Sequence, residues 1–241
     1  MLNAAFQATG LDDWTYELLD VPTAQLRAAV EGLRAPDVAG ANVTIPYKQA
    51  VMDQLDSVAP EALRARAVNT IVNDGGRLGG YNTDIAAIRA AVDEVGVEPE
   101  GINVVILGAG GAARATAVAL DAAHITFVCR RPDDADLPGR AIGWSDPSVP
   151  ALIRSADLLV NATPLGRHEE MPVRPAALPR SGAVVDLVYV TGGTPLVRKA
   201  RSLGLRTVDG WEILLAQGAT AFLMWTGRSA PLDAMRETLQ P

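Results

Sequence analysis

The sequence has little of what metal sites, export and polyanion binding require. Its single cysteine, Cys129, cannot form an internal disulfide, and its two histidines form no Cys/His spacing typical of zinc sites. Lys and Arg number 21 against 28 Asp and Glu, a net charge of -7, which disfavours nucleic acid and membrane partners. No apolar run approaches the roughly 18 residues of a membrane helix, and the start does not resemble a signal peptide. We therefore expect a cytoplasmic protein with no metal.

What the sequence does have is a regular alternation of strand-like and helix-like segments over 241 residues, 49% of them hydrophobic. We expect strands at 16–21, 41–44, 67–72 and 77–82, and helices at 22–33, after residue 45 and from 82 to about 95. A cleaner βαβ pattern begins at "INVVIL", residues 102–107. This alternation predicts an α/β protein with two lobes, hinged near Asp84 to Gly101.

The segment "GAGGAA" matches the dinucleotide-binding fingerprint, with Gly108 and Gly110 at its glycine positions and Ala113 at its small third position. The segment directly follows an apolar strand and opens a helix. In that setting the backbone can approach a pyrophosphate lying on the helix N-terminus. The alternative is a tight glycine turn that holds no ligand.

The segment "CRR" stands where an NAD-preferring fold would present an acid to the ribose hydroxyls. Arg130 and Arg131 instead suit the 2′-phosphate of NADP, because a guanidinium binds a phosphate with charge-assisted hydrogen bonds. The alternative is a pair of solvated loop arginines. Asp133, Asp134 and Asp136 follow closely and keep NAD open as the cofactor.

Two charged residues stand at predicted helix starts. The stretch "NVTIPYKQAV" reads as a strand running into a helix with Lys48 in its first turn, where the positive helix end disfavours a cation. Asp84 follows Asn82, a predicted N-cap, and a carboxylate is favourable there. Each alone could be structural: a solvent-facing lysine and a dipole partner. As a pair they predict an acid/base couple.

Gln217 interrupts the apolar stretch "ILLAQGATAFLMW", and a buried amide needs hydrogen-bond partners. The partner is either the backbone or a ligand. We assign no role to His124 or His168, and Cys129 reads as a small buried strand residue.

Seven motifs together cover nearly the whole chain from residue 3 to 227: "NVTIPYK", "AVNTIV", "GYNTD", "GAGGAARA", "NATPLG", "DLVY" and "DGWEILLAQGATAFLMWTG". In their order and spacing the chain resembles the shikimate dehydrogenase family. The resemblance implies an oxidoreductase of chorismate and aromatic amino acid biosynthesis that reduces 3-dehydroshikimate to shikimate with NADPH, in a cleft between two lobes. It also implies an α/β substrate-binding domain at 1–84 with 211–241 and a Rossmann-type NADP-binding domain at 85–210.

The resemblance also implies roles for individual residues. Lys48 and Asp84 are expected to be the catalytic pair. The expected substrate ligands are Asn42, Thr44, Asn69 and Gln217. The expected cofactor contacts are Gly108, Gly110, Gly111, Ala112 and Arg130, with Asn161, Thr163, Leu187, Tyr189 and Gly210 near the nicotinamide. The expected partner is the small-molecule substrate, and a homodimer is left open.

The sequence departs from the family pattern at three places. Ile85 follows Asp84 where the family usually has glycine, and Cys129-Arg130-Arg131 stand where it often has "NR" and then Thr or Ser. Family members also begin with a strand and a serine turn that holds the substrate carboxylate. This sequence starts at "MLNAAF", just after that turn would end, so we expect weaker capture of shikimate, unpaired strand edges and aggregation of the substrate lobe.

Two other functions stay open from the sequence. One is an NAD-dependent quinate/shikimate dehydrogenase, which cofactor preference would distinguish. The other is a dinucleotide-binding homologue without catalysis, favoured by the absent serine turn. The Lys48/Asp84 pair argues against the second, since a pure binder would not need an acid/base couple.

Overall fold

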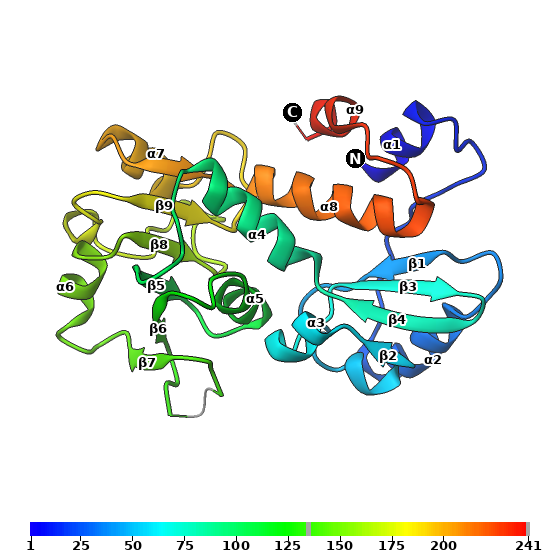
Figure 1. Cartoon of the computed structure of the whole chain (residues 1–241), viewed down its shortest axis with the longest axis horizontal. Helices are drawn as coiled ribbons and strands as arrows, with labels where there is room; N and C mark the ends of the chain where they lie inside the picture. Colours follow the sequence, from blue (N-terminus) through cyan, green and yellow to red (C-terminus); the bar gives the residue numbers. More distant parts are fainter. Residues whose placement is uncertain (134–135, 240–241) are drawn as a thin grey trace. The chain divides into compact units, whose positions relative to one another are not determined.

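The computed structural model describes residues 1–133 and 136–239, and the chain divides into two compact units (Figure 1). Unit 1 comprises Met1–Ala86 and Leu215–Pro241, and unit 2 comprises Ala87–Leu214. Each unit combines helices with one sheet, which confirms the predicted α/β class. The domain limits predicted from the sequence, 1–84 with 211–241 and 85–210, stay a prediction.

The sheet of unit 1 has four short strands in the order β1-β3-β4-β2. Strands β1, β3 and β4 run antiparallel, and β2 pairs parallel to β4. Two glycines with positive φ, Gly75 at 56° and Gly76 at 89°, make the hairpin turn between β3 and β4. The strands are β1 Gly40–Asn42, β2 Ser57–Val58, β3 Thr70–Asp74 and β4 Arg77–Tyr81.

The helices of unit 1 pack through two groups of apolar side chains. The first group joins the sheet to α2 Leu26–Gly32 and α3 Pro60–Ala65, near the 3-10 helices η1 Thr23–Gln25 and η2 Met52–Gln54. The second group joins α1 Leu2–Ala8 and α9 Leu232–Glu237 to the later part of α8 Gly210–Thr226. Trp225 Nε1 donates to the Ile71 carbonyl at 2.9 Å, so α8 is also tied to the sheet.

The sheet of unit 2 is entirely parallel, in the order β10-β9-β8-β5-β6-β7 (Figure 1). From β5 the chain adds strands outward to one side and then returns to add strands on the other, so the order reverses between β5 and β8. This is the doubly wound arrangement of Rossmann-type folds. The strands are β5 Asn103–Leu107, β6 His124–Cys129, β7 Arg140–Gly143, β8 Leu158–Asn161, β9 Ala183–Asp186 and β10 Arg206–Val208.

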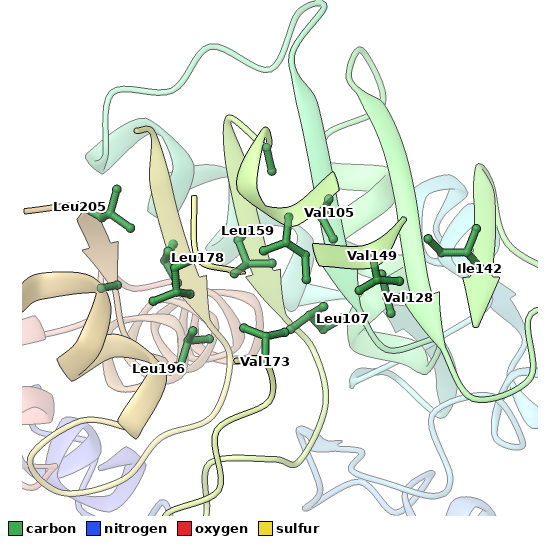
Figure 2. Close-up of a cluster of buried hydrophobic side chains, with 14 residues drawn as sticks. Val105, Leu107, Val128, Ile142, Val149, Leu159, Val173, Leu178, Leu196 and Leu205 are labelled. Carbon is green, nitrogen blue, oxygen red and sulfur yellow. The ribbon is translucent and has the colours of Figure 1, made fainter. Parts of the chain in front are cut away.

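Burial on both faces explains why the central strands of unit 2 read as continuous apolar runs. Figure 2 shows one face, where side chains from the sheet meet those of α6 Val149–Arg154, α7 Pro195–Ser202 and the segment before β9 that contains η3 Pro175–Ala177. Helix α5 Gly111–Ala119 follows β5 directly. The labelled core residues are Val105, Leu107, Val128, Ile142, Val149, Leu159, Val173, Leu178, Leu196 and Leu205.

The unit limits fall inside helices. Helix α4 Thr83–Glu94 contains the first limit, after Ala86, and α8 contains the second, after Leu214. Helix α4 begins as predicted, because the Asn82 side chain accepts a hydrogen bond from the Asp84 N–H at 3.1 Å and so caps the helix.

Two predicted elements are wrong. Residues 16–21 form neither strand nor helix, and Leu18 and Leu19 are 91% and 70% exposed. The predicted helix around Lys48 is a series of turns that leads to η2. In an α-helix the Lys48 carbonyl would accept from Met52 N–H. It accepts instead from Val68 N–H at 2.7 Å, while Met52 N–H donates to Gln49.

None of the helices in the described part of the chain is both long and apolar enough to cross a membrane.

Candidate functional site

Lys48 and Asp84 are in direct contact although they are 36 positions apart in the sequence. Lys48 Nζ donates to Asp84 Oδ2 at 2.6 Å, and the two side chains are 19% and 13% exposed. The Val68 contact holds the Lys48 backbone beside the sheet, and the start of α4 holds Asp84. The structure therefore brings the predicted pair together, but the prediction that Lys48 lies in the first turn of a helix is wrong, so no helix dipole acts on it there.

A network of polar side chains adjoins this ion pair. Asn69 is buried, and its Oδ1 accepts from Thr83 N–H at 2.7 Å and from the hydroxyls of Thr70 and Thr83. Since its Oδ1 is occupied, Asn69 can offer only Nδ2, which donates to Gln217 Oε1 at 3.3 Å. The two predicted amides are thus brought together, and the orientation of Asn69 is set by its neighbours.

Asn42 and Thr44 lie at and beyond the end of β1. Asn42 Nδ2 donates to the Asn69 carbonyl and to Thr70 Oγ1, and its Oδ1 accepts from the Tyr16 hydroxyl at 3.1 Å. Burial raises the pKa of this hydroxyl above its ordinary value, so Tyr16 stays a donor. Thr44 is exposed, and among the described residues its hydroxyl makes one long contact, of 3.4 Å, with the next carbonyl.

The glycine turn between β5 and α5 has the geometry of a phosphate cradle. Gly108 has φ +112°, and a Cβ on it would lie 2.9 Å from the Ala162 carbonyl oxygen. A Cβ on Gly110 would meet nothing within 4 Å, so open space faces this residue. No side chain of the described residues caps α5. Its first-turn N–H groups, including those of Gly111 and Ala112, are the donors that a phosphate uses at a helix N-terminus. A dinucleotide pyrophosphate fits this turn.

Arg130 and Arg131 follow β6 and are exposed. Within the described residues neither has an assigned hydrogen bond or ion pair, so both guanidinium groups are available to an anion. Asp133 is exposed, Asp136 has an interaction, and Asp134 lies outside the described residues. These arginine and aspartate side chains would therefore determine whether the site binds a 2′-phosphate or a ribose hydroxyl.

The residues predicted near the nicotinamide lie at or just beyond the carboxyl ends of β8, β9 and β10. Asn161 is buried, and its Oδ1 accepts from the Thr163 N–H and hydroxyl at 3.1 and 2.7 Å. The Leu187 N–H donates to the Asn161 carbonyl at 3.0 Å. The Tyr189 ring lies 5.2 Å from that of Trp211. Gly210 makes room for this loop, since a Cβ there would lie 2.4 Å from the Val188 carbonyl carbon.

Several polar residues of both groups were not predicted from the sequence. Thr70, Thr83, Asp186 and Thr194 are buried and hydrogen-bonded, and Tyr16 contacts Asn42. The signal that could have revealed Asp186 is an acid inside the apolar run "AVVDLVY", because a buried charge needs dedicated partners. Burial raises the pKa of Asp186 to about 6, although hydrogen bonds from Thr194, Val188 and Asn161 oppose the rise.

Two other features carry no functional argument. Within residues 1–133 and 136–239, no group of three or more His, Cys, Asp or Glu side chains could hold a metal ion. A hollow of about 540 Å³ in unit 1 lies next to Arg34, whose guanidinium is already paired with Asp56 at 2.5 Å and Glu31 at 3.0 Å. Neither Lys48 nor Asp84 lines this hollow.

Comparison with known protein families gives two matches. The family model described as "Shikimate dehydrogenase substrate binding domain" matches residues 1–71. The model described as "Shikimate 5'-dehydrogenase C-terminal domain" matches residues 210–240. The "Shikimate dehydrogenase (NADP(+))" of Symbiobacterium thermophilum is 44% identical over 98% of this chain and 86% of its own length.

Solved structures of similar proteins cover both units. The shikimate 5-dehydrogenase of Thermus thermophilus in complex with NADP(H) and shikimate is 35% identical, with a TM-score of 0.86 over 99% of this chain and 91% of its own. The ligand-free 5-ketofructose reductase of Gluconobacter sp. strain CHM43 is also 35% identical, with a TM-score of 0.84 over 99% of this chain and 91% of its own.

Proposed function

Since the chain belongs to the shikimate dehydrogenase family, we propose that it catalyses the NADP-dependent interconversion of 3-dehydroshikimate and shikimate. The observation that carries this proposal is the contact between Lys48 Nζ and Asp84 Oδ2 at 2.6 Å. Thr83, the residue before Asp84, donates to Asn69, so the ion pair is continuous with the amide network. A proton donor and groups that bind hydroxyls therefore occur together in unit 1.

In this proposal Lys48 is the proton donor. Reduction of a ketone adds a hydride to the carbonyl carbon and a proton to its oxygen. NADPH bound in unit 2 would supply the hydride for the reduction, and NADP⁺ would accept it in the reverse oxidation. Lys48 Nζ donates a hydrogen bond and then a proton to the oxygen as negative charge grows there. Asp84 orients the ammonium group through the ion pair, and water returns a proton to the amine.

The proposed substrate ligands offer hydrogen-bond groups of different kinds. Gln217 has no assigned partner for Nε2 among the described residues, so this nitrogen can donate to a substrate oxygen. The Thr44 hydroxyl is exposed and can donate or accept. Asn42 and Asn69 are engaged by protein groups, and we assign them to shape and orient the site as much as to bind hydroxyls. This set suits a small polyhydroxylated substrate.

The proposed cofactor contacts belong to unit 2. The turn Gly108–Ala112 would hold the pyrophosphate, because its first-turn N–H groups lack side-chain caps and Gly110 faces open space. Arg130 would bind the 2′-phosphate that distinguishes NADP from NAD. Asn161, Thr163, Leu187, Tyr189 and Gly210 would border the nicotinamide, since they follow or touch the carboxyl ends of parallel strands, where such folds bind ligands.

The test is an assay of shikimate-dependent NADP⁺ reduction on the purified chain, with quinate and NAD⁺ as alternative substrate and cofactor. We expect reduction with shikimate and NADP⁺ to have the highest kcat/KM of the four combinations. A higher kcat/KM with NAD⁺ and quinate would favour the NAD-dependent quinate/shikimate dehydrogenase. Binding of NADP⁺ without any turnover would favour the homologue that lacks catalysis.

The similarity to a 5-ketofructose reductase supports a second candidate, reduction of another polyhydroxylated ketone. The same proton donor and hydride chemistry would serve any such ketone. The assay therefore includes 5-ketofructose with NADPH. A kcat/KM for 5-ketofructose above that for 3-dehydroshikimate would replace the proposed substrate while keeping the proposed chemistry.

Three further proposals concern the whole chain. The domain limits 1–84 with 211–241 and 85–210 are supported by the grouping of the proposed substrate and cofactor residues. Limited proteolysis with and without NADP⁺ would test them. Cytoplasmic location is supported by the free, buried Cys129, and cell fractionation tests it. The homodimer also stays a prediction, and light scattering of the purified protein would test it.

A further inference from the structure

Asp186, the last residue of β9, is a buried acid that the proposed reaction does not use. Its side chain is 0% exposed and accepts three hydrogen bonds. Oδ1 accepts from Asn161 Nδ2 at 2.9 Å and from Val188 N–H at 3.0 Å, and Oδ2 accepts from the Thr194 hydroxyl at 2.6 Å. All three partners are donors in this arrangement, which is the pattern that an ionised carboxylate requires.

The three donors belong to the two loops that follow β8 and β9. Asn161 ends β8, and its Nδ2 also donates to the Leu165 carbonyl at 2.9 Å, which shapes the loop 162–166. Val188 lies in the loop 187–194. Thr194 closes that loop and caps α7, where its oxygen accepts from Val197 N–H at 3.2 Å. A single carboxylate therefore connects both loops and the helix that follows them.

The two loops also touch each other directly. Gly166, with φ +112°, lies against Thr194, because an added Cβ would be 3.2 Å from Thr194 Cγ2. On its other side the loop 187–194 packs against Gly210, where an added Cβ would be 2.6 Å from Tyr189 N. Because these neighbours are so close, a change in the hydrogen bonds of Asp186 should shift both loops.

An ionised carboxylate at this position costs stability. Burial is the main cause of its raised pKa, and the negative charge of Asp209 adds to it. Asp209 itself is paired with Arg201 at 3.2 Å. A neutral side chain of the same size would avoid much of this cost, so a role in packing alone does not account for an acid here.

We propose that Asp186 is a positioning residue, whose carboxylate holds the loops 162–166 and 187–194 in the arrangement that places Thr163, Leu187 and Tyr189 against the nicotinamide. This inference rests on the proposed function for its link to the reaction. Asp186 would touch neither substrate nor cofactor and would act through Asn161, Val188 and Thr194. Its loss should therefore affect turnover more than cofactor affinity, most of which comes from the glycine turn and Arg130.

The first test compares Asp186→Asn with Asp157→Asn. Asp157 is the matched control, because it precedes β8 at the opposite end of the same sheet and its Oδ2 accepts from Asn103 N–H. In Asp186→Asn we expect kcat to fall about tenfold or more, with Kd for NADP⁺ changed by less than about threefold. Amide hydrogen exchange in 162–166 and 187–194 should become faster. Asp157→Asn should change none of these quantities.

The pH dependence separates positioning from a purely structural role. Protonation of Asp186 removes a negative acceptor, so exchange in both loops of the unaltered protein should speed up as pH falls through about 6, after correction for intrinsic exchange. Asp186→Asn should lack this transition. Asp209 is the charged group that shifts the midpoint, and with Asp209→Asn the midpoint should move to lower pH.

A second pair of variants tests the proposal if the Asp186→Asn protein does not fold. Thr194→Ser keeps the hydroxyl donor and should match the unaltered protein, whereas Thr194→Val should reproduce the loss of kcat and the faster exchange. Unchanged loop exchange and kcat in Asp186→Asn, or in Thr194→Val if only that protein folds, would overturn the proposal. A loss of kcat that is no larger than the loss of folded protein would also overturn the proposal. Exchange measured with NADP⁺ needs no turnover, so it tests Asp186 even if shikimate is not the substrate.

Discussion

At the scale of single residues, the proposed proton transfer depends on a charged side chain that is held in one orientation. The chain has only two lysines, Lys48 and Lys199. Lys48 is largely buried and paired with Asp84, so its ammonium group is oriented before any substrate arrives. Partial burial also limits screening of the pair by salt. Such preorganisation is what a proton donor needs, because no reorientation is then required during the reaction.

Replacing Lys48 by alanine should therefore lower kcat by about 10² to 10⁴, the usual effect of losing a general acid or base. The Kd for NADP⁺ should be unchanged, because the proposed cofactor contacts are all in unit 2. Steady-state kinetics and cofactor titration measure the two quantities. Lys199→Ala is the matched control and should keep full activity. A loss below about threefold in Lys48→Ala would remove Lys48 from the mechanism.

Arg130 should decide the preference between the two nicotinamide cofactors. A charge-assisted hydrogen bond to the 2′-phosphate is worth about 1.5 to 3 kcal/mol. Arg130→Ala should lower the ratio of kcat/KM for NADP⁺ to that for NAD⁺ by a corresponding factor, with kcat/KM for NAD⁺ nearly unchanged. Arg131→Ala provides the comparison. If only Arg131→Ala changes the ratio, the neighbouring arginine reads the phosphate.

At the scale of elements, the turn from β5 into α5 uses its glycines for different reasons. Gly108 has a positive φ and lies against the Ala162 backbone, so its need for glycine comes from the fold itself. Gly110 has an ordinary φ of −81° and faces open space. Its need for glycine would come only from a ligand that approaches the backbone there.

Alanine substitutions should separate these two reasons. Gly108→Ala should lower the free energy of unfolding by about 1 to 3 kcal/mol, from backbone strain and the contact with Ala162. Gly110→Ala should leave stability unchanged and weaken NADP⁺ binding. Urea unfolding and cofactor titration of both variants test this. Full NADP⁺ affinity in Gly110→Ala would mean that the pyrophosphate does not approach this residue.

At the scale of the whole molecule, Asp186 links stability to pH. Its pKa is about 6 in the folded chain and near 3.8 when exposed. Because the folded value is the higher one, the folded state holds the proton more tightly. The stabilisation from Asp186 is complete below about pH 4 and is lost as pH rises through 6. Asp56, Asp146 and Glu170 act in the opposite direction, because hydrogen bonds lower their pKa values, but they titrate at more acidic pH.

The free energy of unfolding should therefore rise by about 2 kcal/mol between pH 7 and pH 4.5 from Asp186 alone. Asp186→Asn should lose this part of the pH dependence. Urea unfolding of both proteins over this range gives the difference between the two slopes, in which the other acids cancel. Parallel curves would mean that Asp186 is not the titrating group. The expected result also means that this acid lowers stability at the pH where its charge holds the loops.

The sequence by itself determined the features that depend on neighbouring residues. The β5–α5 turn, the cap at Asn82 and the parallel strands of unit 2 could be predicted, because apolar runs, glycine spacing and capping residues act within a few positions. The residue types of the proposed site could also be read from motifs. At 16–21 the same local reasoning failed, since an apolar segment forms a strand only where a neighbouring strand pairs with it.

Only the tertiary structure decided how distant residues meet. The hydrogen bond from Val68 to the Lys48 carbonyl replaced the predicted helix by turns and brought Lys48 to Asp84. The tertiary structure also buries Asp186 at the end of β9, where its carboxylate accepts hydrogen bonds from Asn161 and Thr194 and so connects two loops. These outcomes depend on packing and on hydrogen bonds between segments far apart in the chain. Local propensity carries no information about such contacts, because their energy appears only when the segments are assembled.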